Sequence, residues 1–192
     1  MEKYNFGEDE YYLLSHNIVG ATNMKQLEIA EQFTFTVRAL QFETGEYQLS
    51  AFDYNQFLAL HKHLFQDIYD FAGMLRDVQL AKGNTRFCQM QFIQSELQSI
   101  CDELVNEPVW IDLKMAAERL AYFKSELNII HSFREGNGRT IRLFIHNLAR
   151  HKGYEWDYIN ISQEDYMKAM IHSVTNIELL YQLFLDNLMI KK

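Results

Sequence analysis

Apolar residues recur at helical spacing along most of the chain. The clearest series has members three or four residues apart and consists of Leu113, Ala116, Leu120, Phe123, Leu127 and Ile130. This spacing places the whole series on one face of a helix, so it predicts a buried helix that ends at Ile130. Weaker helical patterns run from Thr22 or Asn23, either of which can cap a helix, to about Leu40, across residues 53–72, and from about Phe92 to Val105.

The segment over about 74–92 has a different pattern of apolar and polar residues. Residues 74–80 alternate weakly between apolar and polar side chains, Lys82, Gly83 and Asn84 provide a turn, and residues 86–92 are rich in bulky side chains. This pattern predicts a short β-hairpin or extended flap. Residues 1–21 read as an irregular or extended lead-in.

Composition sets the fold class. One proline and eight glycines in 192 residues argue against a β-sandwich or barrel, which needs many turns. We therefore expect an all-α fold with a short β-hairpin, built as a single domain over residues 1–192.

The net charge of −8 changes the list of expected partners. A chain this acidic is a poor general ligand for nucleic acid and is repelled by anionic membranes. Cys88 and Cys101 lack CxxC spacing and suggest neither a disulfide framework nor a zinc site. No apolar run approaches the roughly 18 residues of a membrane span, and the acidic start MEKYNFGEDE does not resemble a signal peptide. We expect a cytoplasmic protein, with export as an effector left open.

Candidate chemistry concentrates in residues 131–142, HSFREGNGRTIR. Here the predicted buried helix ends, a tight loop carries Gly136, Asn137 and Gly138, and a new helix begins. Glycines let a ligand approach the backbone closely, and the free N–H groups of a helix N-terminus favour anions. The segment therefore predicts an anion site, for which phosphate is the usual ligand.

Local charge agrees with this prediction. Residues 131–152 contain five Lys and Arg residues and one acidic residue. Arg139 and Arg142 lie one turn apart and can hold a polyphosphate, while the helical period places His146 and Arg150 on the same polar face. Glu135 is the carboxylate placed to hold Mg²⁺ against phosphate oxygens, and His131 is the natural general base.

Each feature alone has an ordinary structural explanation. A histidine at the end of an apolar helix is usually a satisfied core residue, a basic helix face is usually solvated, and a Gly-Asn-Gly loop can be only a turn. All three explanations would have to hold together within twelve residues, so a functional site is favoured.

Residues 131–142 resemble the signature of the Fic family, His-Pro-Phe-x-(Asp/Glu)-Gly-Asn-Gly-Arg-x-x-Arg, with Ser132 in place of the usual proline. Residues 60–73, LHKHLFQDIYDFAG, resemble the family segment HxxLFxDIYxWAG, and residues 82–84 resemble its flap. The resemblance extends over roughly residues 10–190.

This resemblance implies a helical enzyme that transfers AMP from ATP to a Ser, Thr or Tyr hydroxyl of a target protein. His131 would be the general base, Glu135 would hold Mg²⁺, and Phe133 would anchor the loop in the core. Phosphates would be held by Gly136, Asn137, Gly138, Arg139 and Arg142. The flap at Lys82, Gly83 and Asn84 would align the target as an added strand, and the flap and C-terminal helices would contact adenine.

Alternatives within the family are transfer of UMP or phosphocholine, or removal of AMP; outside catalysis, the fold could serve as a binding module. Many Fic enzymes are inhibited by a helix with the sequence (Ser/Thr)-x-x-x-Glu-(Gly/Asn), whose glutamate pairs with the second arginine, here Arg142. The 192 residues contain no such hexapeptide. The resemblance is therefore to the subclass with a separate, small, helical antitoxin-like inhibitor, although an unrestrained enzyme is the other option. The sequence leaves the oligomeric state open.

Overall fold

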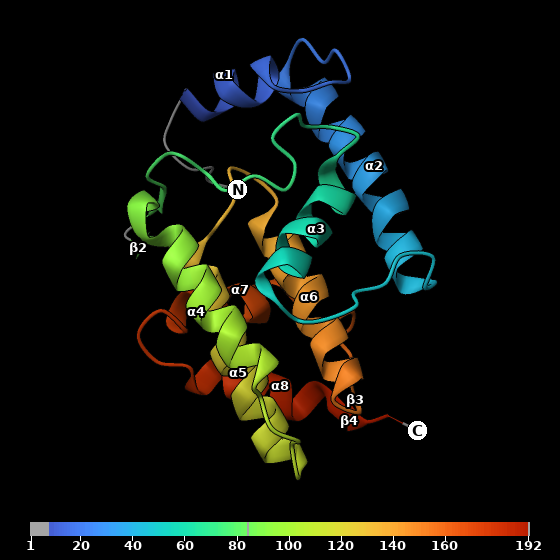
Figure 1. Cartoon of the computed structure of the whole chain (residues 1–192), viewed down its shortest axis with the longest axis vertical. Helices are drawn as coiled ribbons and strands as arrows, with labels where there is room; N and C mark the ends of the chain where they lie inside the picture. Colours follow the sequence, from blue (N-terminus) through green and yellow to red (C-terminus); the bar gives the residue numbers. More distant parts are fainter. Residues whose placement is uncertain (1–7, 84, 192) are drawn as a thin grey trace.

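The protein is described by a computed structural model that covers residues 8–83 and 85–191. Figure 1 shows a mostly helical molecule. Its helices are α1 (Glu8–Ser15), α2 (Met24–Glu43), α3 (Tyr54–Phe65), the 3-10 turn η1 (Met90–Phe92), α4 (Ile93–Val105), α5 (Leu113–Ile130), α6 (Asn137–His151), α7 (Gln163–His172) and α8 (Glu178–Asn187). Its strands are β1 (Ala81–Lys82), β2 (Thr85–Arg86), β3 (Tyr154–Trp156) and β4 (Leu188–Ile190). The predicted all-α class with a short hairpin is confirmed.

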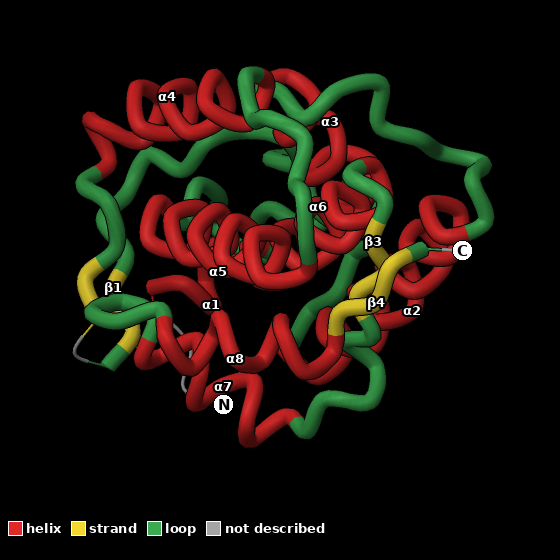
Figure 2. The backbone as a smooth tube through the Cα atoms, turned by 90° about the horizontal axis from the view of Figure 1, so that it is seen from below, coloured by secondary structure: helices red, strands yellow, loops and turns green. Residues whose placement is uncertain are grey.

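Helix α5 forms the centre of the core. It packs against α4, α6 and α8, and Figure 2 shows these helices around it. Ala116, Ala117 and Ala121 are fully buried on α5, and their small side chains allow close approach of neighbouring helices. Because α5 ends in the core, the residue after it is also held there, and that residue is His131.

Short polar side chains begin several helices, and the cap expected at Asn23 is one of them. Asn23, Asp53 and Asp112 each accept a hydrogen bond from the backbone N–H three residues later, at the starts of α2, α3 and α5. The predicted helices that begin near Asn23, Phe92 and Leu113 are therefore confirmed, with α2 running slightly further than expected.

The expected helix over residues 53–72 is too long, because α3 ends at Phe65. The following segment instead pairs with the chain near the N-terminus: Ile18 N–H donates to the Ile68 carbonyl at 2.9 Å, and Asp70 N–H donates to the His16 carbonyl at 3.2 Å. These long-range hydrogen bonds replace the helical ones, and Gly73 then turns the chain with a φ of +84°.

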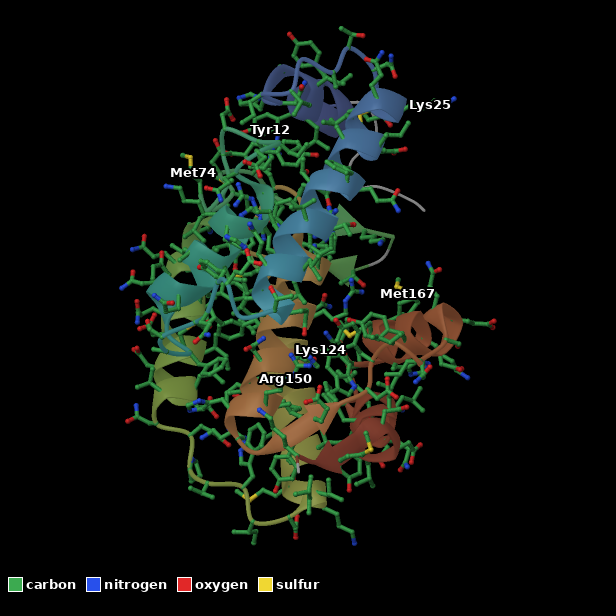
Figure 3. The ribbon with its side chains drawn as sticks, turned by 90° about the vertical axis from the view of Figure 1, so that its right-hand side faces the viewer. Tyr12, Lys25, Met74, Lys124, Arg150 and Met167 are labelled. Atoms are coloured by element: carbon green, nitrogen blue, oxygen red, sulfur yellow. The ribbon has the colours of Figure 1, made fainter. Side chains whose placement is uncertain are left out.

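The expectation of an irregular lead-in over residues 1–21 is wrong for residues 8–15 and right for residues 16–21, while residues 1–7 lie outside the described residues. Residues 8–15 form α1, which buries Leu13. Tyr12 of α1 lies against the Arg134 guanidinium, with 3.8 Å between the ring centre and Cζ, so this helix covers the loop after α5 (Figure 3). A helix of eight residues leaves little periodicity to detect.

The predicted hairpin is present but very short. Strand β1 pairs antiparallel with β2, with Ala81 opposite Arg86 and Lys82 opposite Thr85. Gly83 occupies the turn with a φ of +56°, whereas Asn84 lies outside the described residues. A second antiparallel pair, β3 with β4, has no counterpart in the sequence prediction and joins the chain after α6 to the chain after α8.

Within the described residues, no helix combines the length and apolar character needed to cross a bilayer.

Candidate active site

The candidate site occupies the junction between α5 and α6. His131 follows α5 in a left-handed conformation, with φ 50° and ψ 60°, which is uncommon for a residue other than glycine. This geometry turns the chain out of α5 and into the loop that leads to α6. The predicted loop and helix start over residues 131–142 is therefore confirmed in outline.

The His131 imidazole has a defined hydrogen-bonding state. Its Nδ1 lies 3.0 Å from the Asn128 carbonyl oxygen, which can only accept, so Nδ1 carries the hydrogen. In the neutral ring this leaves the lone pair on Nε2. The ring also stacks on Phe87 of the segment after β2, with ring centres 3.8 Å apart.

Burial lowers the pKa of His131 to about 3, and the nearby charges of Arg76 and Lys82 act in the same direction. The hydrogen bond to Asn128 opposes this change. The imidazole is therefore neutral at physiological pH, which is the form that can accept a proton.

Two side chains close the loop. Asn137 accepts from the Phe133 N–H at 2.8 Å through Oδ1 and donates to the Phe133 carbonyl at 2.6 Å through Nδ2. The Asn137 side chain thus shapes the loop from within and is buried. Phe133 is fully buried and stacks on His61, with ring centres 3.7 Å apart, which confirms its expected place in the core.

His61 of α3 fixes the same loop from the other side. The Gly73 N–H donates to its Nδ1 at 2.8 Å, so its Nε2 carries the hydrogen that is donated to the Glu135 carbonyl at 2.9 Å. Burial lowers the pKa of His61 to about 3, so this bridge persists in the neutral form. The sequence prediction gave His61 no role of its own, although it lies in the HxxLF segment.

The two loop glycines meet different surroundings. Gly136 has a φ of +80°, and a Cβ there would lie 2.4 Å from the Phe65 ring. A Cβ on Gly138 would have no described atom within 4 Å. Gly138 begins the first turn of α6, where N–H groups lack intrahelical partners, so the open space beside it suits an anion.

Glu135 and Arg139 lie together beside this helix N-terminus. The Glu135 Oε1 accepts from the Gly136 N–H at 2.8 Å and lies 3.3 Å from Arg139 Nη2. The Arg139 guanidinium lies against the stacked Phe35 and Phe65 rings, with its Cζ 5.1 and 4.8 Å from their centres.

The donor set fits Mg²⁺ brought in with a nucleotide. Within residues 8–83 and 85–191, no group of three metal-ligating side chains occurs, so the described chain offers no site made of protein ligands alone. Mg²⁺ commonly binds one or two carboxylates together with substrate phosphates and water. The Glu135 carboxylate beside an anion-binding helix end meets that requirement.

Arg142 lies in a different environment from Arg139. It lines a cavity of about 270 Å³ with Tyr158, Ile161, Gln163 and Tyr166. Near it lies the buried amine of Lys124, 5.2 Å from the Tyr166 ring centre (Figure 3). The two arginines thus project from the same end of α6 toward different neighbours.

The expected polar face of α6 is only partly present. His146 is buried, with 3% of its surface exposed, and its Nε2 lies 3.7 Å from carboxylate oxygens of both Glu43 and Glu155. Arg150 forms ion pairs with the same two glutamates. Because α6 is packed on several sides, the helical period did not predict which of its polar residues face solvent.

Arg76 is a buried residue that the sequence prediction missed. Its Nε donates to the His131 carbonyl at 2.6 Å, and its Nη2 donates to the carbonyls of Cys88 at 2.6 Å and Ile130 at 3.2 Å. It therefore joins the end of α5 to the chain after the hairpin. The available signal was an arginine placed directly after the apolar FAGML run.

Ser132 also has a structural consequence. Its side chain is buried, and within the described part of the chain its Oγ finds no hydrogen-bond partner. Proline, the usual residue at this position of the Fic signature, has no hydroxyl. Cys88 and Cys101 are both free thiols.

Comparison with known proteins gives the context for this geometry. Residues 51–149 match the sequence model of the Fic/DOC family. The chain is 32% identical over 171 residues to the probable protein adenylyltransferase Fic of Escherichia coli K12, covering 88% of this chain and 86% of that protein. It is 34% identical over 180 residues to the protein adenylyltransferase VbhT of Bartonella schoenbuchensis, covering 90% of this chain but only 37% of VbhT.

A solved structure shares the architecture. The N-terminal Fic domain of a VirB-translocated effector protein from Bartonella quintana, with bound ADP, superposes with a TM-score of 0.82. The two are 25% identical, and the match covers 92% of this chain and 91% of that one. From the family match, the identity to relatives and the shared fold, we conclude that this chain belongs to the Fic/DOC family.

Proposed function

We propose that this chain is a protein adenylyltransferase that transfers AMP from ATP to a Ser, Thr or Tyr hydroxyl of a target protein. Relatives at 32–34% identity carry the name protein adenylyltransferase. The observation that carries the proposal is the neutral His131 imidazole, with its hydrogen on Nδ1, beside the N-terminus of α6.

In the proposed reaction the hydroxyl oxygen of the target attacks the α-phosphorus of ATP. A bond forms between that oxygen and phosphorus, the bond to the β-phosphate oxygen breaks, and pyrophosphate leaves. The hydroxyl proton passes to His131 Nε2. The ring then carries a positive charge. The positive charges of Arg76 and Lys82 disfavour this protonated form, and the negative charge of the polyphosphate stabilises it.

Backbone and arginine groups position the nucleotide. The N–H groups at Gly136, Asn137 and Gly138 would surround the phosphates, with the Gly136 N–H exchanging its Glu135 Oε1 partner for a phosphate oxygen. Arg139 and Arg142 would provide charge on two sides of the phosphates. Glu135 would hold Mg²⁺, which neutralises phosphate charge when bound.

The hairpin presents the target hydroxyl to His131. The proposed flap comprises Lys82 and Gly83, together with Asn84, which lies outside the described residues. Backbone hydrogen bonds from this flap would hold the target in an extended conformation. Support comes from Phe87, which links the segment after β2 to the His131 ring.

The decisive experiment incubates the purified chain with α-³²P-ATP, Mg²⁺ and cell lysate. We expect label on protein, loss of label in His131→Ala, and retained ATP binding in that variant. His151→Ala, which removes an exposed histidine at the far end of α6, is the matched control. Equal labelling by wild type and His131→Ala would contradict the proposed base. A parallel reaction with α-³²P-UTP tests the alternative nucleotide, and label from UTP alone would overturn AMP transfer.

Regulation is proposed to come from a separate small helical protein that carries the missing (Ser/Thr)-x-x-x-Glu-(Gly/Asn) segment. Its glutamate would pair with Arg142 and displace the terminal phosphate. We expect the chain alone to be active, and the partner to inhibit it until the partner's glutamate is changed to glycine. If the chain alone transfers no AMP but becomes active when the residues after about Ser173 are deleted, the inhibitor is internal, which would contradict a separate inhibitor protein.

The proposed site of action is the cytoplasm, with export as the alternative. The Bartonella quintana relative is described as VirB-translocated. Fractionation of the native host separates these two, and recovery of the protein in the medium would favour export.

A further inference from the structure

An acidic residue far from the loop in sequence reaches the phosphate site. Glu31 lies on α2, and its Oε1 is 2.8 Å from Arg139 Nη2. Both side chains are largely covered, with 15% of Glu31 and 24% of Arg139 exposed. Figure 1 shows α2 running alongside α3, and α3 in turn packs against α6. This ion pair therefore connects a separate helix to the candidate active site.

Glu31 is itself held in place. Its Oε2 accepts a hydrogen bond from the Tyr69 hydroxyl. Burial, followed by the charge of Glu31, raises the pKa of Tyr69, so the hydroxyl remains protonated and continues to donate. The glutamate consequently has one partner on each carboxylate oxygen, and its position is restricted.

Arg139 is shared between two carboxylates. The same Nη2 atom lies 2.8 Å from Glu31 and 3.3 Å from Glu135. The shorter distance belongs to Glu31, and the stacked Phe35 and Phe65 rings cover one side of the guanidinium. One cation beside two anions leaves a net negative charge, which is what a divalent cation requires.

We infer that Glu31, fixed by Tyr69, is a positioning residue that keeps Arg139 from forming a full ion pair with Glu135. This inference rests on the proposed function, in which Glu135 holds Mg²⁺. Because Arg139 pairs with Glu31, it pairs less strongly with Glu135. The Glu135 carboxylate therefore remains available to the cation. Without Glu31, Arg139 pairs with Glu135 alone, and the cation must compete with that pair.

The test compares Glu31→Gln with wild type over a range of Mg²⁺ concentrations. We expect the half-saturating Mg²⁺ concentration for AMP transfer to rise about tenfold, with kcat at saturating Mg²⁺ within about twofold of wild type. Tyr69→Phe keeps the ring but removes the hydroxyl that fixes Glu31, so it should show a smaller shift in the same direction. Glu46→Gln, an exposed glutamate just beyond α2, is the control and should show none.

A second readout is independent of transfer. Electron paramagnetic resonance measures Mn²⁺ binding to the protein with a non-hydrolysable ATP analogue, and we expect weaker Mn²⁺ binding in Glu31→Gln. Unchanged Mn²⁺ affinity and unchanged Mg²⁺ dependence in both variants would overturn the inference. So would a loss of activity that excess Mg²⁺ does not restore, because Glu31 would then act only on the fold.

The two proposals fail in different ways. If wild type transfers no AMP, the proposed function is wrong, but the Mn²⁺ comparison still decides the role of Glu31. If Glu31→Gln does not fold, as judged by circular dichroism, Tyr69→Phe carries the same comparison because it keeps the buried ring.

Discussion

Gly136 and Gly138 stand two residues apart, yet their surroundings impose different requirements. Gly136 needs a left-handed backbone and closely approaches the Phe65 ring. Gly138 has neither restriction from the described protein, and the space beside it remains open. At the scale of single residues, one glycine is required by the fold, and the other leaves room for the phosphate ligand that we propose.

This difference predicts opposite results for one substitution. Gly136→Ala should lower the free energy of unfolding by about 3 kcal/mol, because it adds a left-handed Cβ and a steric overlap with Phe65. Gly138→Ala should keep the free energy of unfolding within about 1 kcal/mol of wild type, since alanine favours a helix. It should nevertheless weaken ATP binding. Urea denaturation and calorimetric ATP titration measure the two effects.

Equal stability of the two alanine variants would contradict the steric argument. Wild-type ATP affinity in Gly138→Ala would contradict the placement of the phosphates.

At the scale of elements, Arg76 joins α5 to the hairpin region. Its guanidinium donates to the His131 and Ile130 carbonyls at the end of α5 and to the Cys88 carbonyl after β2. A cation at a helix C-terminus is also favoured by the helix dipole. The same residue therefore fixes His131 and the segment at the base of the hairpin.

Arg76→Met should lower the free energy of unfolding by roughly 3 kcal/mol, because several buried carbonyls lose charged donors. It should also speed amide exchange at Cys88, whose N–H donates to the Ile129 carbonyl at 2.9 Å. Hydrogen exchange and urea denaturation provide the measurements, and Arg86→Met on the exposed side of β2 is the control. If Arg76→Met lowers the free energy of unfolding no more than Arg86→Met does, Arg76 does not support this junction.

The hairpin allows a second prediction at this scale. Gly83 has a φ of +56°, which proline cannot adopt, so Gly83→Pro should disrupt the turn between β1 and β2. Because the phosphates would bind at the α5–α6 junction and the flap would contribute only to the adenine contacts, ATP affinity should fall far less than transfer to target protein, which should drop more than tenfold. Labelling of lysate proteins and ATP titration, run on the same preparation, separate the two. Undiminished labelling would show that target docking does not depend on this turn.

At the scale of the whole molecule, two buried neutral histidines couple stability to pH. Burial lowers the pKa of His61 and of His131 from 6.5 to about 3. In the unfolded chain both histidines bind protons at the ordinary pKa, whereas in the folded protein they do not. Their contribution to stability is therefore complete above pH 6.5 and is lost as the pH falls toward 3.

Lowering the pH from about 7.5 to about 5.5 should reduce the free energy of unfolding by roughly 1 kcal/mol for each of the two histidines. Urea denaturation at both pH values measures this loss. His131→Ala should reduce this loss by roughly 1 kcal/mol, while His61 and His63, whose pKa values burial also lowers, keep their contributions. His151→Ala should leave the pH dependence unchanged. A pH dependence that is the same in His131→Ala and wild type would contradict a buried, neutral His131.

Much of this protein was determined by local sequence. The α5 stripe, the Asn23 cap and the 131–142 segment predicted helices α2 and α5 and the place of the site, because helical periodicity and capping act between residues close in the chain. The motif also identified His131, Glu135 and the loop glycines as a group.

Tertiary structure decided what depends on partners far apart in sequence. It ended α3 at Phe65 through pairing with residues 16–18, formed the β3–β4 pair, and buried His146 between two glutamates. It also placed Glu31 of α2 on Arg139 and Arg76 on the His131 carbonyl. Periodicity cannot reveal such contacts, because hydrogen bonds and ion pairs between distant segments exist only once the helices have packed around α5.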